Sequence, residues 1–130
     1  MPAHLTIAGP WPPAVVLPLG ELAEEARGLH GTRFELGKVG SLGGALCLFP
    51  TDDAALLAGR EGILRAVGVP DLLDDDWRLH LTLRRDGAVP IGAEKDLQSL
   101  ERALPVACVV RELTIAELDG YGRLNLQPLQ

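Results

Sequence analysis

The chain has 130 residues, of which 47% are apolar and 23% charged, and this fits one globular domain over residues 1–130. No apolar run approaches the roughly 18 residues of a membrane span, and no basic start with a following apolar stretch indicates a secretory signal. We therefore expect a cytoplasmic protein without a membrane partner. The net charge of −6 argues against long duplex nucleic acid as a partner. A nucleotide or a short RNA end stays open, because one phosphate needs only a few local cations.

The first half of the chain is predicted to contain short strands and helices separated by loops. In chain order we expect a strand at residues 4–8, a proline-rich loop at 10–18 and a helix at 20–30. A strand at 32–36, a glycine-rich turn at 37–44 and a strand at 45–49 are expected to follow. A second helix is expected to follow Thr51, which is a suitable N-cap residue. Apolar side chains at helical spacing predict that one face of each helix is buried.

The second half is predicted to be richer in strands. We expect an acidic loop at residues 71–76, a strand at 78–84, a turn at 86–90 and a helix at 93–104. One long or two short strands at 105–118, a hairpin turn at 119–122 and a final strand at 123–126 are expected to follow. Helices and strands alternate, yet several strands pair most naturally as hairpins. The sequence therefore predicts an α+β domain with antiparallel sheet.

One short pattern occurs twice and carries the functional argument. Residues 4–7 read HLTI and residues 80–83 read HLTL. In a strand, residues two apart point to the same face, so each copy presents an imidazole beside a hydroxyl and turns its two apolar residues toward a core. Any half-buried strand can show this alternation. The probability that two of three histidines carry this pattern by accident is on the order of one in a thousand, which favours a functional pair.

Such paired side chains suit phosphoryl chemistry. His4 and His80 can divide the work of general base and general acid on a phosphate ester, because a histidine pKa of roughly 6.5 leaves both protonation states accessible. The hydroxyls of Thr6 and Thr82 can donate to a non-bridging phosphate oxygen. The third histidine, His30, is expected at a helix end in a capping or exposed position.

The duplicated motif resembles the two His-x-Thr-x motifs of the 2H phosphoesterase superfamily, which includes the RNA 2′,3′-cyclic phosphodiesterases also called 2′-5′ RNA ligases. The resemblance extends to an aromatic-bearing turn at residues 8–11, basic residues after the second motif at 84–85, and final strands over residues 113–122. It implies catalytic roles for His4 and His80 and phosphate-binding roles for Thr6 and Thr82. It also implies a phosphodiesterase that needs neither a metal nor a cofactor.

The same resemblance implies a two-lobed antiparallel-sheet fold with pseudo-twofold symmetry and a central cleft. Family members usually carry a strand and a helix before the first motif, whereas only three residues precede His4. The expectation is a first lobe shortened at its N-terminus. Exposed strand edges are usually covered, so a homodimer that covers this edge is the corresponding partner prediction.

Three further side chains are candidates for contacts with the substrate. Arg84 shares the strand face of the second motif and is expected to contact phosphate or base, or else to pair with Asp86 at the surface. Trp11 and Tyr121 can stack on a base, because aromatic faces accept any nucleobase. Trp77, just before the second motif, is expected to be a packing anchor.

Three functions remain compatible with these residues. The leading one is cleavage of 2′,3′-cyclic or 2′-5′ phosphodiester bonds in nucleotides or short RNA ends. A non-catalytic nucleotide- or phosphate-binding module is the alternative, although binding alone would tolerate the loss of one imidazole. The third is a metal-dependent hydrolase with His4 and His80 as ligands, which activity in excess chelator would distinguish.

Overall fold

The computed structural model describes residues 3–73, 77–84 and 93–129, and within them the chain forms three helices and six strands. The helices are α1 (Leu19–Leu29), α2 (Ala54–Val67) and α3 (Ala93–Ala103). The strands are β1 (Arg33–Leu42), β2 (Ala45–Pro50), β3 (Leu81–Arg84), β4 (Val106–Val109), β5 (Leu113–Leu118) and β6 (Leu124–Leu129). The predicted turn at residues 86–90 lies outside the described residues.

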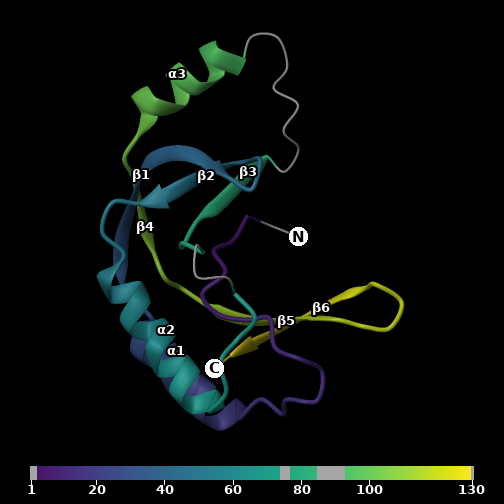
Figure 1. Cartoon of the computed structure of the whole chain (residues 1–130). Helices are drawn as coiled ribbons and strands as arrows, with labels where there is room; N and C mark the ends of the chain where they lie inside the picture. The colour runs from purple at the N-terminus through teal and green to yellow at the C-terminus, as the bar shows by residue number, and fades with distance from the viewer. Residues whose placement is uncertain (1–2, 74–76, 85–92, 130) are drawn as a thin grey trace.

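The strands form two antiparallel sheets. Four of them pair in the order β3-β2-β1-β4, and β5 pairs with β6 as a separate hairpin. The larger sheet curls, with α1 and α2 side by side at one end and α3 at the other (Figure 1). This mixture of helices and antiparallel sheet confirms the predicted α+β class. Among the described residues, no helix has the length and apolar character that crossing a bilayer requires.

The β1–β2 hairpin corrects the predicted turn at residues 37–44. The turn is confined to Gly43 and Gly44, whose φ angles of 58° and 80° lie in the left-handed region that favours glycine. Gly37 and Gly40 belong to β1 instead. A Cβ atom at Gly40 would lie 3.1 Å from the ring of Phe49, so this glycine serves close packing across the hairpin rather than chain reversal.

Helix α2 begins later than its sequence suggests. Its N-cap is Asp53, and the carboxylate of Asp52 accepts a hydrogen bond from the Ala54 amide at 3.0 Å. The prediction that Thr51 caps this helix is therefore wrong. Aspartate oxygens compete well for free amides at a helix start, and two aspartates stand closer to it than the threonine does.

One hydrophobic cluster of the core lies between α1 and α2. Leu22, Leu29 and Ile63 form its buried centre. The N-terminal segment, the start of β5 and the end of β6 pack around this centre, with Ile7, Ala8, Trp11, Leu113, Ile115 and Leu129 among the contributing residues. The residues that directly follow the first motif are thus fixed by the helical core.

Gly59 allows the two helices to approach closely. A Cβ atom there would lie 2.5 to 2.8 Å from the side chain of Leu29, whereas one at Gly28 would meet nothing within 4 Å. We expect Gly59→Ala to lower the free energy of unfolding by about 1–3 kcal/mol through overpacking. Gly28→Ala, the matched control, should raise it by about 0.5–1 kcal/mol because alanine favours helix. Urea unfolding of both variants tests this, and equal stabilities would contradict the described packing.

Candidate functional site

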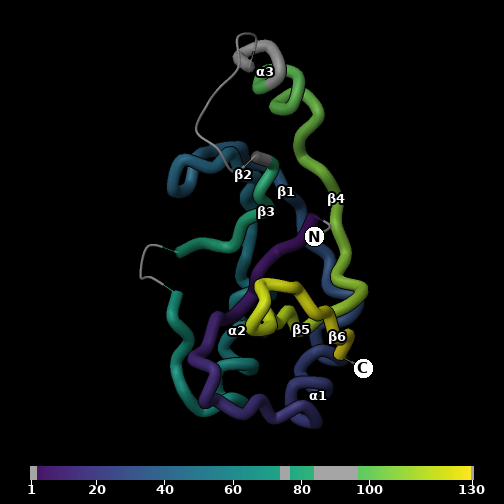
Figure 2. Tube along the Cα trace, turned by 90° about the vertical axis from the view of Figure 1, so that its right-hand side faces the viewer, coloured from purple at the N-terminus to yellow at the C-terminus, as the bar shows by residue number. Residues whose placement is uncertain are grey.

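The structure brings the two motifs together. Leu5 forms an isolated antiparallel bridge with Leu81, and Leu81 in turn pairs with Leu48 of β2. The second motif therefore lies between β2 and the first motif. Figures 1 and 2 both show the N-terminal segment alongside β3, on the inner side of the curled sheet. The predicted strand at residues 4–8 is reduced to this single bridge, and β3 starts only at Leu81, so the prediction of a strand from residue 78 is wrong in its first part.

The bridge sets how the histidines and threonines face one another. In an antiparallel pair centred on Leu5 and Leu81, the next positions place His4 against Thr82 and Thr6 against His80. Residues that oppose each other this way have Cα atoms about 4.5–5.5 Å apart and point to the same side. From this register we expect the two histidine–threonine pairs on the face opposite the leucines. His4 and Thr6 are exposed, while His80 and Thr82 are half-buried.

His80 is held in one ring orientation. Its Nδ1 lies 2.7 Å from the backbone carbonyl oxygen of Arg78, which can only accept a hydrogen bond. Nδ1 therefore carries a hydrogen, and Nε2 is the nitrogen left to exchange a proton with a substrate. A fixed ring orientation suits an imidazole to general acid or base chemistry.

The ring of Phe49 packs beside that of His80. The two ring centroids are 6.4 Å apart with planes inclined at 48°, and Phe49 is buried, with 8% of its surface exposed. Gly40 also lies against the phenyl ring. The position of the imidazole thus depends on packing across β1 and β2 as well as on its hydrogen bond.

An ion pair fixes the segment after the first motif. The Arg60 guanidinium contacts the Asp71 carboxylate at 2.6 and 3.0 Å and also donates to the carbonyl oxygen of Ile7 at 3.0 Å. The same carboxylate accepts a hydrogen bond from the Gly9 amide at 2.9 Å. The Arg60 and Asp71 side chains are only 16% and 5% exposed. We call this group the Arg60–Asp71 clamp.

The clamp also reaches the second motif. The Arg60 guanidinium carbon lies 4.8 Å from the centre of the Trp77 ring, three residues before His80. Burial raises the pKa of the Asp71 carboxyl, but hydrogen bonds from Arg60 and the Gly9 amide, together with the charge of Arg60, bring that pKa below its usual 3.8. Asp71 is therefore a carboxylate at neutral pH, and one charged pair ties together the approaches to both motifs.

The remaining predicted site residues occupy separate places. Trp11 donates its indole hydrogen to the Val69 carbonyl at 3.2 Å and packs on the helical core, and its base-stacking role stays a prediction. Tyr121 is 86% exposed in the β5–β6 turn, which projects from the body of the protein (Figure 1). Arg84 ends β3 opposite Leu46, and its side chain lies outside the described part.

Sequence reasoning missed Arg60, Asp71, Phe49 and the carbonyl of Arg78. The sequence places Asp71 in an acidic loop, yet its carboxylate is nearly buried against Arg60. The periodicity of a helix does not predict contacts with a residue in the loop beyond its end, so it could not relate Arg60 to Asp71. The one signal for Arg60 was its position in α2 between Gly59 and Gly62, which lie on the buried face of that helix.

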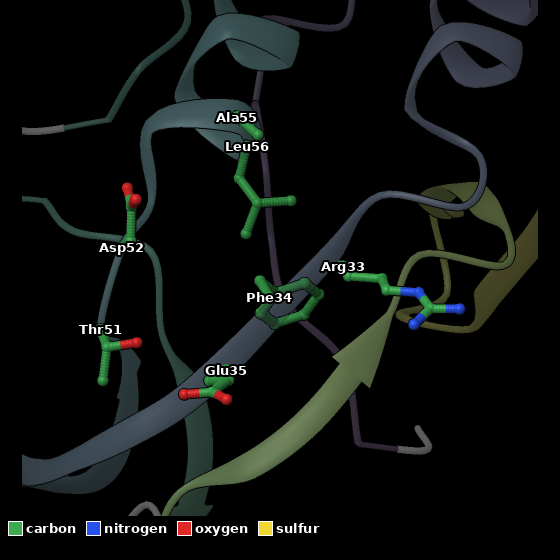
Figure 3. A pocket seen from close by; sticks show the side chains of 7 residues that line it. All are labelled: Arg33, Phe34, Glu35, Thr51, Asp52, Ala55 and Leu56. Atoms are coloured by element: carbon green, nitrogen blue, oxygen red, sulfur yellow. The ribbon is translucent and has the colours of Figure 1, made fainter.

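A surface hollow of about 260 Å³ lies elsewhere, between β1 and the start of α2 (Figure 3). Its lining residues are Arg33, Phe34, Glu35, Thr51, Asp52, Ala55 and Leu56. None of them belongs to either motif, and charges of both signs lie around it. In the described part of the chain, no three histidine, cysteine, aspartate or glutamate side chains gather as a metal site would need.

Comparison with known proteins supports the relationship that the motifs suggested. The family model described as the 2′-5′ RNA ligase superfamily matches residues 1–122. Comparison with curated proteins gives no significant match, and neither does comparison with solved structures. Because the family match covers nearly the whole chain, this protein belongs to the 2′-5′ RNA ligase superfamily, which is the 2H phosphoesterase superfamily.

Proposed function

We propose that the protein is a metal-independent phosphodiesterase that acts on 2′,3′-cyclic or 2′-5′ phosphodiester bonds of nucleotides or short RNA ends. Membership of the superfamily supports phosphoesterase-type activity in general. The observation that carries the finer proposal is the Leu5–Leu81 bridge, whose antiparallel register favours both histidine–threonine pairs on one face. A phosphate on that face can be approached by an imidazole from each motif.

In the proposed reaction, one histidine removes the proton from the attacking water or hydroxyl. The other protonates the oxygen that leaves phosphorus, so one imidazole starts neutral and the other charged. For a 2′,3′-cyclic phosphate attacked by water, one P–O bond forms, one ring P–O bond breaks, and the product is a phosphomonoester. His80 exchanges its proton through Nε2, since its Nδ1 is bonded to the Arg78 carbonyl.

The two threonines complete the phosphate site. Each hydroxyl lies on the same face as the imidazole of the opposite motif, and can donate to a non-bridging oxygen as negative charge develops there. A hydrogen bond to a charged group is worth about 1.5–3 kcal/mol. Thr6→Ala or Thr82→Ala should therefore reduce turnover by about 10- to 150-fold.

A substrate panel in excess chelator tests this function. We expect turnover of 2′,3′-cyclic nucleotides, 2′-5′ dinucleotides or ADP-ribose cyclic phosphate, each giving a phosphomonoester that phosphorus NMR identifies. Tight binding of these compounds without product would assign the face to a binding module and refute the enzymatic proposal. Turnover that disappears with chelator and returns with zinc would assign His4 and His80 to a metal site.

A further inference from the structure

Arg78 lies next to the histidine pair and is not part of either motif. It precedes His80 by two residues, and its carbonyl oxygen holds the imidazole at 2.7 Å. Its guanidinium carbon lies 4.5 Å from the centre of the Phe49 ring, whose centroid is 6.4 Å from that of His80. One aromatic ring therefore contacts both the imidazole and the arginine side chain.

Among the described residues, no ion pair engages the charge of Arg78. Arg78 is exposed, and the ion pairs within residues 3–73, 77–84 and 93–129 are Arg60–Asp71 and Arg123–Asp119. Stacking on a ring occupies a face of the guanidinium and leaves its N–H edge to donate two parallel hydrogen bonds to phosphate oxygens. In a chain of net charge −6, this side chain presents a cation next to the proposed reaction centre.

The spacing indicates which phosphate Arg78 would reach. Two residues of chain span at most about 7 Å, so the Cα atoms of Arg78 and His80 lie within that distance. Consecutive phosphates of a single nucleic acid strand are separated by a comparable length. When one phosphate of a nucleic acid strand is held between the histidines, the next phosphate of that nucleic acid strand would lie beside Arg78.

We propose that Arg78 binds a second phosphate of the substrate, adjacent to the one at the histidine pair. The preferred substrate class is then an RNA end or a nucleotide that carries a further phosphate, rather than a lone cyclic mononucleotide. This inference rests on the proposed function, because it takes the histidine face as the place where phosphate binds.

The test compares two substrates that differ by one phosphate. Kinetics are measured with adenosine 2′,3′-cyclic phosphate and with its 5′-phosphorylated form, using the wild type, Arg78→Met and Arg78→Lys. We expect Arg78→Met to lower kcat/KM about 10- to 100-fold for the 5′-phosphorylated substrate and less than about threefold for the other. Arg78→Lys should recover part of the loss, since an ammonium keeps the charge without the paired hydrogen bonds.

Arg123→Met provides the matched control. Arg123 also stacks on an aromatic ring, with its guanidinium carbon 5.4 Å from the centre of Tyr121, but it lies at the β5–β6 turn. Its replacement should leave both substrates unaffected. An equal loss on both substrates in Arg78→Met would make Arg78 a positioning residue for His80 and overturn the proposal. No loss on either substrate would overturn it as well.

Binding separates this inference from the proposed function. Calorimetry with adenosine 2′-phosphate and adenosine 2′,5′-bisphosphate needs no turnover. We expect Arg78→Met to weaken the bisphosphate about 10- to 100-fold and to leave the monophosphate nearly unchanged. If the protein shows that result but has no activity, the phosphodiesterase proposal is refuted and the phosphate site at Arg78 is kept. Equal affinities of the wild type and the variant for the bisphosphate would refute only the phosphate site.

Discussion

Replacing either histidine of the paired motifs by alanine is expected to lower kcat/KM by about 10²- to 10⁴-fold, the contribution typical of a positioned general acid or base. In the proposed mechanism both imidazoles act on the same phosphate, in keeping with the register of the Leu5–Leu81 bridge. The double variant should be little worse than either single variant, because residues that act as a unit are not additive. Steady-state kinetics on the best substrate of the panel measure all three.

His30→Ala is the control for this experiment. His30 also bonds through Nδ1 to a backbone carbonyl, that of Arg111 at 3.0 Å, but it ends α1 away from both motifs. Its loss should leave kcat/KM within about twofold of the wild type, as expected for a surface substitution. The pH–rate profile of the wild type should be bell-shaped, since one imidazole must be neutral and the other charged. A folded His80→Ala protein with full activity would refute the mechanism.

Asp71→Asn is expected to lower the free energy of unfolding by about 3 kcal/mol. Removing one partner of a buried ion pair leaves an uncompensated charge, here that of Arg60, which is 16% exposed. Activity should fall as well, because the clamp holds the carbonyl of Ile7, which ends the first motif, and the amide of Gly9 just after it. Urea unfolding and kinetics under conditions where the variant is folded measure the two effects separately.

The exposed ion pair between Arg123 and Asp119 is the control for the Asp71→Asn experiment. Arg123 and Asp119 are 75% and 30% exposed, and Arg123→Met should cost less than about 1 kcal/mol. The two pairs therefore differ by burial, which is the property that the prediction depends on. If both variants lose the same small amount of stability, the Arg60–Asp71 clamp does not support the fold as described.

The clamp also predicts a pH dependence. The pKa of Asp71 is lower in the folded chain than its usual 3.8, so folding favours the ionised carboxyl. Its contribution to stability is fully present above that usual value and is lost as the pH falls through the lower pKa of the folded state. The stability difference between wild type and Asp71→Asn should thus be constant near neutrality and shrink in acid below about pH 3.8. A difference that grows on acidification would contradict the assignment.

The helices and the family could be predicted from the sequence because both depend on local patterns. Leu22, Ala26 and Leu29 recur at helical spacing and are buried in α1. The hairpin turn at residues 119–122 is confirmed, with the Asp119 carboxylate accepting hydrogen bonds from the Tyr121 and Arg123 amides. Each of these features involves neighbours along the chain.

The features that prediction missed depend on contacts between distant segments. Gly37 and Gly40 suggested a turn, but β1 runs through both. The residues around His4 have the alternation of a strand, yet the structure pairs only Leu5, through one bridge to Leu81. Nothing in the sequence relates Asp71 to the Gly9 amide 62 residues away, because the path of the loops decides which backbone groups the carboxylate meets.

One measurement addresses the paired-histidine mechanism most directly. Wild type and His80→Ala are each treated with excess chelator, given a substrate with a 2′,3′-cyclic phosphate end, and followed by phosphorus NMR. The mechanism predicts that the wild type converts the cyclic phosphate into one phosphomonoester at an unchanged rate, and that His80→Ala is at least about 10²-fold slower. No conversion by the wild type until zinc is added, or equal rates for the two proteins, would contradict it.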